Sequence, residues 1–439
     1  MGRRTDSGAA TGTAVEPLTG WRRALGLVLL ITVPIAALVG LGWVFLGSSG
    51  YWPGSSMTTA WEATDEGGPA ADFGGRGTWL VGDSVVRGRY DAVTGFDAAT
   101  GGRRWQYLPP RRTDICAVSP TADGSLLLIA YGSRATAPDS ATGQVPEGAG
   151  CSTVAALDLA DGRELWHAPR VPEPESPGNT HAEGLLAAGG GLGVVLDAGK
   201  DARAVRALDL RTGTPRWTAA VPAGCSPDLA ATAPQQVLVL LTCGDEEKLA
   251  AFDPADGKQR WTVPLDARRG VDARARASFT ATEPIVVRVD GSAPGFLAFG
   301  PDGRPTARIA AGGARYGTIG SAAAVADGRL YARTDGGRWG RIAAFDLATG
   351  NQLWQSDLGG ARSTVSGLHA QGGKVMALLT STKYGDSLHV FDADTGDEVE
   401  DRAFRDHVGP ADTLILHRDL VIAVRPDDPH WPFSAFRRW

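Results

Sequence analysis

The sequence of 439 residues is poor in the side chains that most often carry chemistry. It has 4 Cys, 3 Met and 7 His, only two Asn, and no adjacent Cys pair. Because it also lacks C-x-x-C and His-x-His, a zinc site is disfavoured, and the scattered histidines are expected to be solvated or hydrogen-bonded in loops. Walker A and G-x-S-x-G sequences are absent too. The chain therefore lacks the principal motifs of P-loop nucleotide-binding enzymes and of α/β-hydrolases.

Positive charge is also scarce relative to negative charge. The formal net charge is −6 and the sequence pI is about 5.7. General nucleic-acid binding requires a basic surface that displaces counterions, so the composition predicts no nucleic-acid partner.

One long uncharged run is present near the N-terminus, from Ala24 to Gly47. About 20 apolar residues cross a bilayer as a helix, and Trp21 and Trp43 would suit the two interfaces. Arg22 and Arg23 precede the run, and the positive-inside rule then places the N-terminus in the cytoplasm. A cleaved signal peptide is the alternative, but its apolar region is normally 7–15 residues long.

These features predict a single-pass protein of the plasma membrane with its main domain outside. The expected organisation is a disordered cytoplasmic tail at 1–20, a transmembrane helix at 21–47, a linker at 48–56 and an exterior domain at 57–439.

The exterior domain is organised by an internal repeat. The pattern is an apolar pair, Asp, two variable residues, Thr or Asp, Gly, three variable residues and Trp, as in ALDLRTGTPRW at Ala207–Trp217. The apolar run predicts a buried strand, Asp-x-x-[Thr/Asp]-Gly predicts a turn, and Trp lies on the next strand. The repeat residues are Asp97 and Trp105, Asp158 and Trp166, Asp209 and Trp217, Asp253 and Trp261, Asp346 and Trp354, and Asp392, with Glu400 in place of Trp.

The spacing of the repeats predicts an all-β fold, a β-propeller. Successive turns are 44 to 61 residues apart, with two further apolar strands between them, and such a period with four strands is typical of propeller blades. One copy, AFGPDGRP from Ala298, has lost both Asp and Trp. The count favours eight blades, with seven as the alternative. The orphan strand around Trp61 is expected to complete the last blade, which has no fourth strand of its own.

The repeat resembles the PQQ-like, or quinoprotein-type and WD40-like, β-propeller repeat over about residues 57–439. The family includes quinoprotein alcohol and glucose dehydrogenases. It also has a non-catalytic branch, which includes the propeller lipoprotein of the outer-membrane β-barrel assembly machinery. The resemblance to the dehydrogenases would imply a vicinal Cys pair beside the quinone and Asn, Glu and Asp around Ca²⁺. This chain has no such Cys pair, and its two asparagines are Asn179 and Asn351. We therefore expect no PQQ, no metal and no catalytic residues, and we interpret the repeat aspartates as turn residues.

The four cysteines are expected to form structural disulfides. Cys225 begins a first strand and Cys243 ends the second strand of the same blade, so antiparallel pairing would place them opposite each other. Cys116 begins another first strand and is expected to pair with Cys151, just before the third strand.

The expected function is that of a binding or scaffold module that receives a protein, peptide or cell-wall component. The longest insertions, 131–150 and 167–184, follow a second and a fourth strand, so both lie on one face of the propeller. Whether they are functional or neutral stays open. A quinone-dependent dehydrogenase and an exterior sensor are the alternatives. Basic residues in loops suit an acidic partner or simply solvation, and they are Arg111, Arg112, Arg268, Arg269, Arg274, Arg276, Arg333 and Arg338.

Overall fold

The computed structural model divides the chain into two compact units, Met1–Trp52 and Pro53–Trp439, and each is described by itself. The residues that the structure describes are 20–48, 56–63, 76–132, 152–170, 184–199, 202–266, 271, 275–312, 318–335, 340–358, 363–381, 385–426, 428 and 430–438.

The first unit contains one helix, α1 (Gly20–Ser48), with Pro34 inside it. Among the described residues, no helix is long and apolar enough to cross a membrane. The prediction of a single-pass plasma-membrane protein with a cytoplasmic N-terminus and an exterior propeller is therefore wrong. The expected tail lies outside the described residues except for Gly20, and most of the expected linker, 49–55, does so too.

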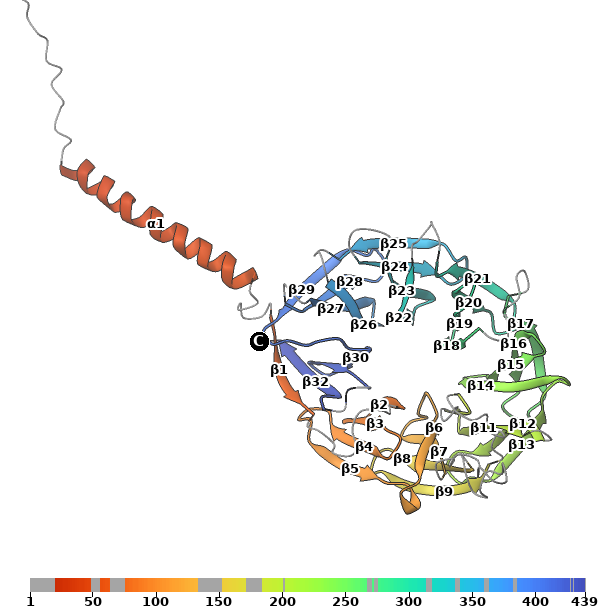
Figure 1. Ribbon diagram of the computed structural model, residues 1–439. Coiled ribbons are helices and arrows are strands. Elements are labelled where there is room, and N and C mark those ends of the chain that lie inside the picture. Colours follow the sequence, from red (N-terminus) through yellow and green to blue (C-terminus); the bar gives the residue numbers. More distant parts are fainter. Residues whose placement is uncertain are drawn as a thin grey trace, which may run out of the picture. The chain divides into compact units, whose positions relative to one another are not determined.

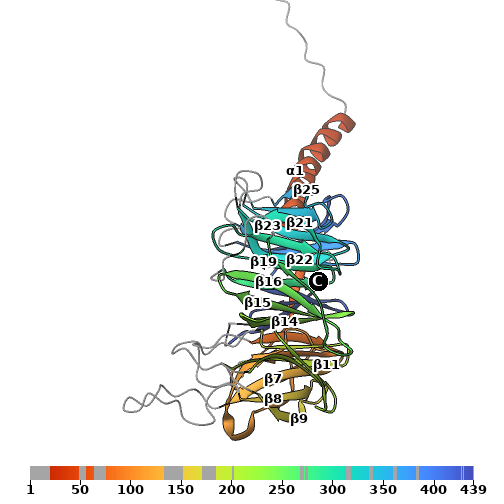
Figure 2. The same cartoon turned by 90° about the vertical axis from the view of Figure 1, so that its right-hand side faces the viewer.

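The second unit is all-β and forms a ring of sheets around a central axis (Figure 1). Among the described residues there are six four-stranded sheets and one eight-stranded sheet. Seen from its edge in Figure 2, the ring is flat and the sheets run through its thickness. This is the architecture of a β-propeller, as the repeat predicted.

In each four-stranded sheet the strands are arranged from the axis outward in chain order. The first strands are β2 (Gly77–Val81), β6 (Asp114–Val118), β10 (Leu186–Gly189), β14 (Cys225–Ala233), β18 (Ala277–Thr282), β22 (Ile319–Ala326), β26 (Ser363–Gln371) and β30 (Thr413–His417). The second strands are β3 (Ser84–Gly88), β7 (Leu126–Gly132), β11 (Leu192–Gly199), β15 (Gln236–Cys243), β19 (Ile285–Val289), β23 (Arg329–Thr334), β27 (Lys374–Ser381) and β31 (Leu420–Val424).

The outer strands follow the same order. The third strands are β4 (Val93–Asp97), β8 (Thr153–Asp158), β12 (Ala202–Asp209), β16 (Glu246–Phe252), β20 (Gly295–Phe299), β24 (Arg341–Asp346), β28 (Ser387–Asp392) and β32 (Phe433–Arg438). The outermost strands are β5 (Arg103–Tyr107), β9 (Arg163–Pro169), β13 (Pro215–Ala220), β17 (Gln259–Pro264), β21 (Pro305–Ala310), β25 (Gln352–Asp357), β29 (Glu398–Phe404) and β1 (Ser56–Glu62). In the eight-stranded sheet, β26 to β29 and β30 to β32 run outward in the same order, and β1 lies between β29 and β32. A 3-10 helix, η1 (Pro110–Arg112), precedes β6.

The N-terminal strand closes the ring. β1 pairs antiparallel with β32, with Trp61 opposite Ala435, so the expected position of the strand that bears Trp61 is confirmed. β1 also touches β29 in parallel through two residue pairs, at Ser56 and Met57, and this contact joins two groups of four strands into the eight-stranded sheet. β32, the last strand that the structure describes, therefore has no unpaired edge where β1 lies.

The core lies between neighbouring sheets. The second and third strands are buried on both faces; β7, for example, is buried at every residue from Leu126 to Gly132. One cluster joins Val194 and Val205 of one sheet to Val239 and Ala250 of the next. The inner strands of the repeats are continuous apolar runs in the sequence because each sheet packs against a neighbouring sheet on both of its faces.

The two ends of the ring differ in their connections. One end carries the turns between first and second strands, as at Gly82, and between third and fourth strands, as at Gly101. We call this end the turn face. The opposite end carries the second-to-third connections and the links between sheets, and we call it the loop face.

Candidate functional site

The repeat aspartates organise the turns between third and fourth strands. In the first sheet, one carboxylate oxygen of Asp97 accepts hydrogen bonds from the backbone N–H of Ala99 and Thr100, each at 2.9 Å. Its other oxygen accepts from Arg104. All six accept from the N–H two residues on, at 2.7 to 3.2 Å, and these aspartates are Asp97, Asp158, Asp209, Asp253, Asp346 and Asp392.

The electrostatics of these turns fit a structural role. The Arg216 guanidinium is the largest influence on Asp209 and, with the Thr212 hydroxyl, lowers the pKa of that carboxyl to about 2. A carboxylate held ionised by its own turn accepts hydrogen bonds and is a poor general base near neutral pH.

The repeat tryptophans connect each sheet to the next one. The indole of Trp217 packs on the turn glycine Gly257, where an added Cβ would lie 2.5 Å from the ring, and its N–H donates to Pro254 O at 2.8 Å. Gly257 has φ +74°, so the glycine is needed both for the turn and for the indole. Indole N–H groups donate in the same way from Trp61, Trp166, Trp217, Trp261 and Trp354.

Trp105 departs from this pattern in one respect. Its ring covers Gly162 as expected, but its Nε1 is buried and has no hydrogen-bond partner among the described residues. The packing role of Trp105 is therefore retained without the hydrogen bond.

The sheet junction that follows β21 has no indole. In β21 the tryptophan position is Ala307, and the facing turn glycine, Gly350, lies close to the backbone: an added Cβ would be 3.2 Å from Arg308 O. The hydroxyl of Thr306 donates to Leu347 O at 2.8 Å and so replaces the missing indole N–H.

One predicted disulfide lies near the loop face. Cys225 and Cys243 are bonded, with their Cα atoms 4.1 Å apart, and they are register partners of β14 and β15. Cys116 is also disulfide-bonded. Its expected partner, Cys151, lies outside the described residues.

Much of the expected partner-binding surface lies outside the described residues. This applies to the greater part of both long insertions, 133–151 and 171–183, and to Asn179, Arg268, Arg269, Arg274 and Arg338. Of the other basic residues, Arg111 and Arg112 are exposed in η1 with positive φ, Arg276 is exposed before β18, and Arg333 pairs with Asp335 at 2.9 Å.

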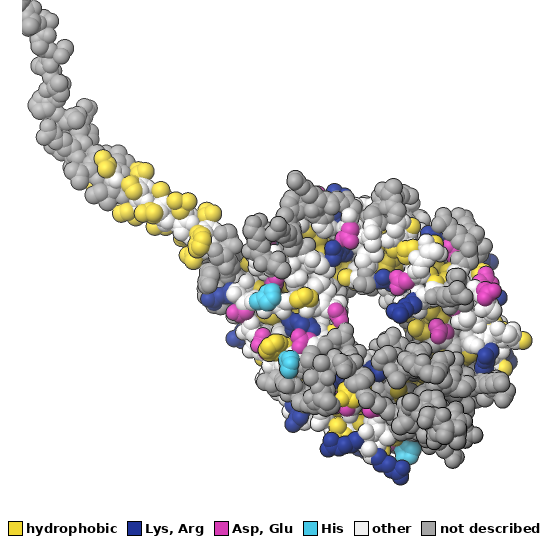
Figure 3. All heavy atoms as spheres, in the orientation of Figure 1, with side chains coloured by type: hydrophobic (Ala, Val, Ile, Leu, Met, Phe, Trp, Pro, Cys, Tyr) yellow, Lys and Arg dark blue, Asp and Glu magenta, His cyan; other side chains and the backbone are white. Residues whose placement is uncertain are grey.

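A cavity of about 490 Å³ lies along the central channel, which Figure 3 shows as an opening through the ring. Its wall comes from the first strands of several sheets and includes Val118, Leu229 and Phe279. The hydroxyls of Thr121 and Thr232 also line it, and both donate to Ala188 O, at 3.0 and 2.9 Å. The cavity therefore combines apolar surface with hydroxyls, two of which are already bonded within the fold.

A buried carboxyl lies near the start of β16, toward the loop face. Glu247 is 2% exposed, and burial is the main cause that raises its pKa to about 7, opposed by a hydrogen bond from Thr242 and assisted by the charge of Asp228. Its second oxygen has no partner among the described residues. Sequence patterns missed Glu247 because nothing at the start of a third strand distinguishes a buried Glu from a solvated one.

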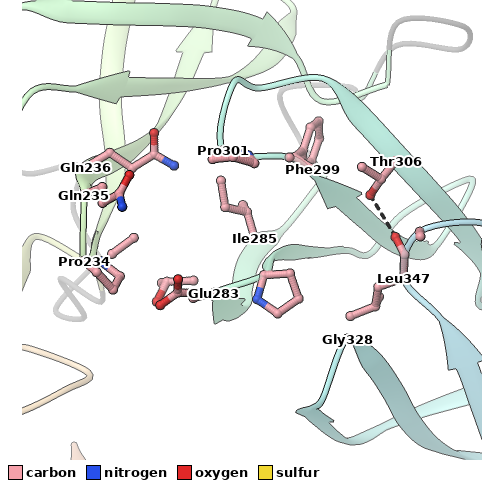
Figure 4. Close-up of a pocket in the computed structure, with 15 residues that line it drawn as sticks. Pro234, Gln235, Gln236, Glu283, Ile285, Phe299, Pro301, Thr306, Gly328 and Leu347 are labelled. Carbon is pink, nitrogen blue, oxygen red and sulfur yellow. Dashed lines mark hydrogen bonds between the residues drawn. The ribbon is translucent and has the colours of Figure 1, made fainter.

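A second cavity, of about 430 Å³, opens on the turn face. Figure 4 shows its walls, which come from the turns at Pro234, Glu283 and Gly328 and from Phe299 and Leu347. The degraded repeat from Ala298 was visible in the sequence, but the cavity beside it was not predicted.

The resemblance to the dehydrogenases implies a vicinal Cys pair beside the quinone and a set of oxygen ligands for Ca²⁺. The described disulfide joins Cys225 and Cys243 across two strands and is not vicinal. Among the described residues, the single cluster with metal-ligand spacing is His389, Glu398 and Asp401, which belongs to the outer strands β28 and β29 and not to the channel. The His389 ring there already contacts Glu398 and Ser387. The described donor set does not fit the quinone site.

A family model described as outer membrane protein assembly factor BamB matches residues 148–299 and 338–435. No curated protein matches the chain.

Among solved structures, the chain is similar to the quinohemoprotein alcohol dehydrogenase ADHIIG from Pseudomonas putida HK5, with 12% identity, a TM-score of 0.51, and 87% of this chain and 76% of that chain covered. Another is BamB from Moraxella catarrhalis, with 15% identity, a TM-score of 0.47, and 82% and 96% covered. A europium-containing methanol dehydrogenase has 14% identity, a TM-score of 0.49, and 84% and 85% covered. At these identities the likeness concerns the fold alone, and of these three structures the alcohol dehydrogenase, with its TM-score of 0.51, supports the fold.

Proposed function

Because the chain belongs to the PQQ-like β-propeller repeat family, whose matching model describes an outer membrane protein assembly factor, we propose that it is a non-enzymatic module that binds other proteins. The partner would be a protein, a peptide or a cell-wall component that meets the loop face and the mouth of the channel. An assembly factor works through contacts with other proteins, which supports this reading over a catalytic one.

We also infer that the propeller has eight blades. The eight-stranded sheet contains two groups of four strands, and only two residue pairs of β1 and β29 join them. Counting those groups as separate blades gives each blade one first strand near the axis. Strand β1 would then be the fourth strand of the blade that contains β30, β31 and β32.

The observation that carries the proposed function is the channel cavity. It combines apolar side chains, such as Leu229 and Phe279, with hydroxyls already bonded within the fold. Cavities of several hundred Å³ with mostly apolar walls and a few polar groups are typical binding sites. Held in a closed ring, such a cavity changes little on binding.

The channel cavity can be blocked without disturbing the core. Ser278 is exposed and lines the cavity, so Ser278→Trp should fill it. Gln259 is exposed on the outer strand β17, and Gln259→Trp is the matched control. Proteins retained by immobilised full chain would be identified, and the dissociation constant of the purified partner measured for each variant. Binding should be weakened at least about tenfold by Ser278→Trp and unchanged by Gln259→Trp.

Equal retention by both variants would contradict the placement of the site. The rival function, a quinone-dependent oxidoreductase, has its own test: the purified full chain is mixed with PQQ and Ca²⁺ and passed through gel filtration. Retained stoichiometric quinone, or oxidation of an alcohol or aldose, would overturn the binding-module proposal.

A further inference from the structure

Arginine side chains on the turn face bridge one sheet to the next. Arg329 begins β23 and is the register partner of the repeat aspartate Asp346. Its guanidinium crosses to the neighbouring sheet, where it donates to Ala393 O at 2.8 Å and to the carboxylate of Asp394 at 2.5 Å. Arg418 similarly reaches Asp83, at 2.8 Å.

The preceding sheet has no such bridge. There the last register pair is Ile285 and Phe299, so the two positions that correspond to Arg329 and Asp346 are Pro284 and Gly300. Neither has a polar side chain. The turn-face cavity opens beside them and extends to Leu347, which holds the place that Ala393 has in the next sheet.

Two polar side chains at this cavity, Gln236 and Glu283, can accept hydrogen bonds from a ligand. Gln236 is 5% exposed, and its amide oxygen has no partner among the described residues. Figure 4 shows this amide with its nitrogen toward Pro301 and its oxygen pointing away. A 180° rotation of the amide exchanges the two atoms and turns the acceptor toward the cavity. Glu283 lines the same cavity with an exposed carboxylate that has no ion pair among the described residues. An unsatisfied buried acceptor costs free energy, which a ligand with N–H donors recovers.

We propose that the turn-face cavity binds an arginine side chain presented by a protein partner. The aliphatic part of the arginine packs against Ile285, Phe299 and Leu347, and the guanidinium donates to Gln236 and to the Glu283 carboxylate. Thr306 uses one lone pair of Leu347 O, and the other lone pair can accept a further N–H. A guanidinium fits better than an ammonium because its planar fork reaches several acceptors at once.

This inference goes beyond the proposed function, since it concerns the opposite face of the ring and names the group that is bound. It is independent of whether the channel cavity takes a ligand.

The test uses three acetylated tripeptide amides, Gly-Arg-Gly, Gly-Lys-Gly and Gly-citrulline-Gly, titrated calorimetrically into the full chain. The arginine peptide should bind, the lysine peptide more weakly, and the uncharged citrulline peptide weakest of all. Glu283→Gln should weaken arginine binding about five- to tenfold, because a charge-assisted hydrogen bond is lost. The matched control is Asp245→Asn, which removes an exposed carboxylate at the loop face and should change nothing.

A second variant checks the location. Ala348 is exposed and lines the cavity, so Ala348→Trp should abolish arginine binding by occupying the space. Equal affinities for the three peptides, no binding by the wild-type chain, or undiminished binding by Glu283→Gln or Ala348→Trp would each overturn the proposal. Ser278→Trp should leave arginine binding intact, so the two proposals can fail separately.

Discussion

Two successive junctions of the ring differ by one indole. Where β17 meets the next sheet, Trp261 covers the turn glycine Gly303 and donates to Pro301 O at 3.0 Å. Where β21 meets the following sheet, Ala307 stands in its place, the backbone closes in on Gly350, and Thr306 supplies the donor. Both junctions therefore satisfy the turn carbonyl. The indole adds packing area between the two sheets. In the junction without an indole, the backbone of one sheet lies closer to the turn of the next.

The largest effect is expected where an indole also helps to close the ring. Trp61 is 8% exposed and donates to Ala98 O of the first sheet. Trp61→Ala should lower the free energy of unfolding by roughly 3–5 kcal/mol, as for other buried Trp truncations, measured by urea denaturation. Trp354→Ala removes a partly exposed indole away from the closure and should cost less. Wild-type stability of Trp61→Ala would show that β1 does not close the ring.

The contact between indole and glycine can be broken from the glycine side. Gly257→Ala should cost roughly 2–3 kcal/mol, because the new Cβ meets Trp217 at 2.5 Å and the backbone has φ +74°. Gly373→Ala is the control, since its φ is +69° and no atom lies within 4 Å of the added Cβ. The control should cost about 1 kcal/mol from backbone strain alone. Equal losses of unfolding free energy would mean that the indole contributes nothing at this turn.

Restoring the tryptophan to the degraded junction sharpens the comparison. Because the backbone at Arg308 already lies close to Gly350, Ala307→Trp should destabilise the protein by roughly 1–3 kcal/mol through overpacking. Gln259→Trp, on an exposed position, should be nearly neutral. An increase in the denaturation midpoint of Ala307→Trp would show instead that the junction had kept room for the indole.

The smallest expected effect concerns acid. The folded pKa of Asp209 is about 2, below the ordinary value of 3.8, so ionised Asp209 stabilises the fold above about pH 4. That contribution is lost as the pH falls toward 2. Asp209→Asn should make stability fall less steeply over this interval, and Arg216→Met should do the same, since its guanidinium is the main cause of the shift. Unchanged slopes in thermal melts of both variants would contradict this account. The degraded turn has Gly300 in place of the aspartate and lacks this response.

Local patterns predicted the strands and turns because their causes are local. Asp97 and Gly101 make a turn from neighbours in the chain, and the apolar runs before the turns mark buried strands. The pairing of Cys225 with Cys243 followed from antiparallel register in the same way. The membrane-spanning interpretation, which relied on the apolar run and its flanking Trp and Arg residues, was wrong, since no helix among the described residues meets the length and hydropathy of a span.

The sequence by itself determined the repeat unit, the propeller and the closing strand, because an Asp-to-Gly turn and a strand depend on residues a few positions apart. Only the tertiary structure decided what the tryptophans do, since each packs on a turn 40 to 57 residues further along the chain, as Trp217 does on Gly257. The same holds for the two cavities. Gln236, Pro284 and Leu347 come together only because three sheets meet at one face. The space between sheets depends on how the sheets pack and cannot be predicted from the sequence of any one sheet.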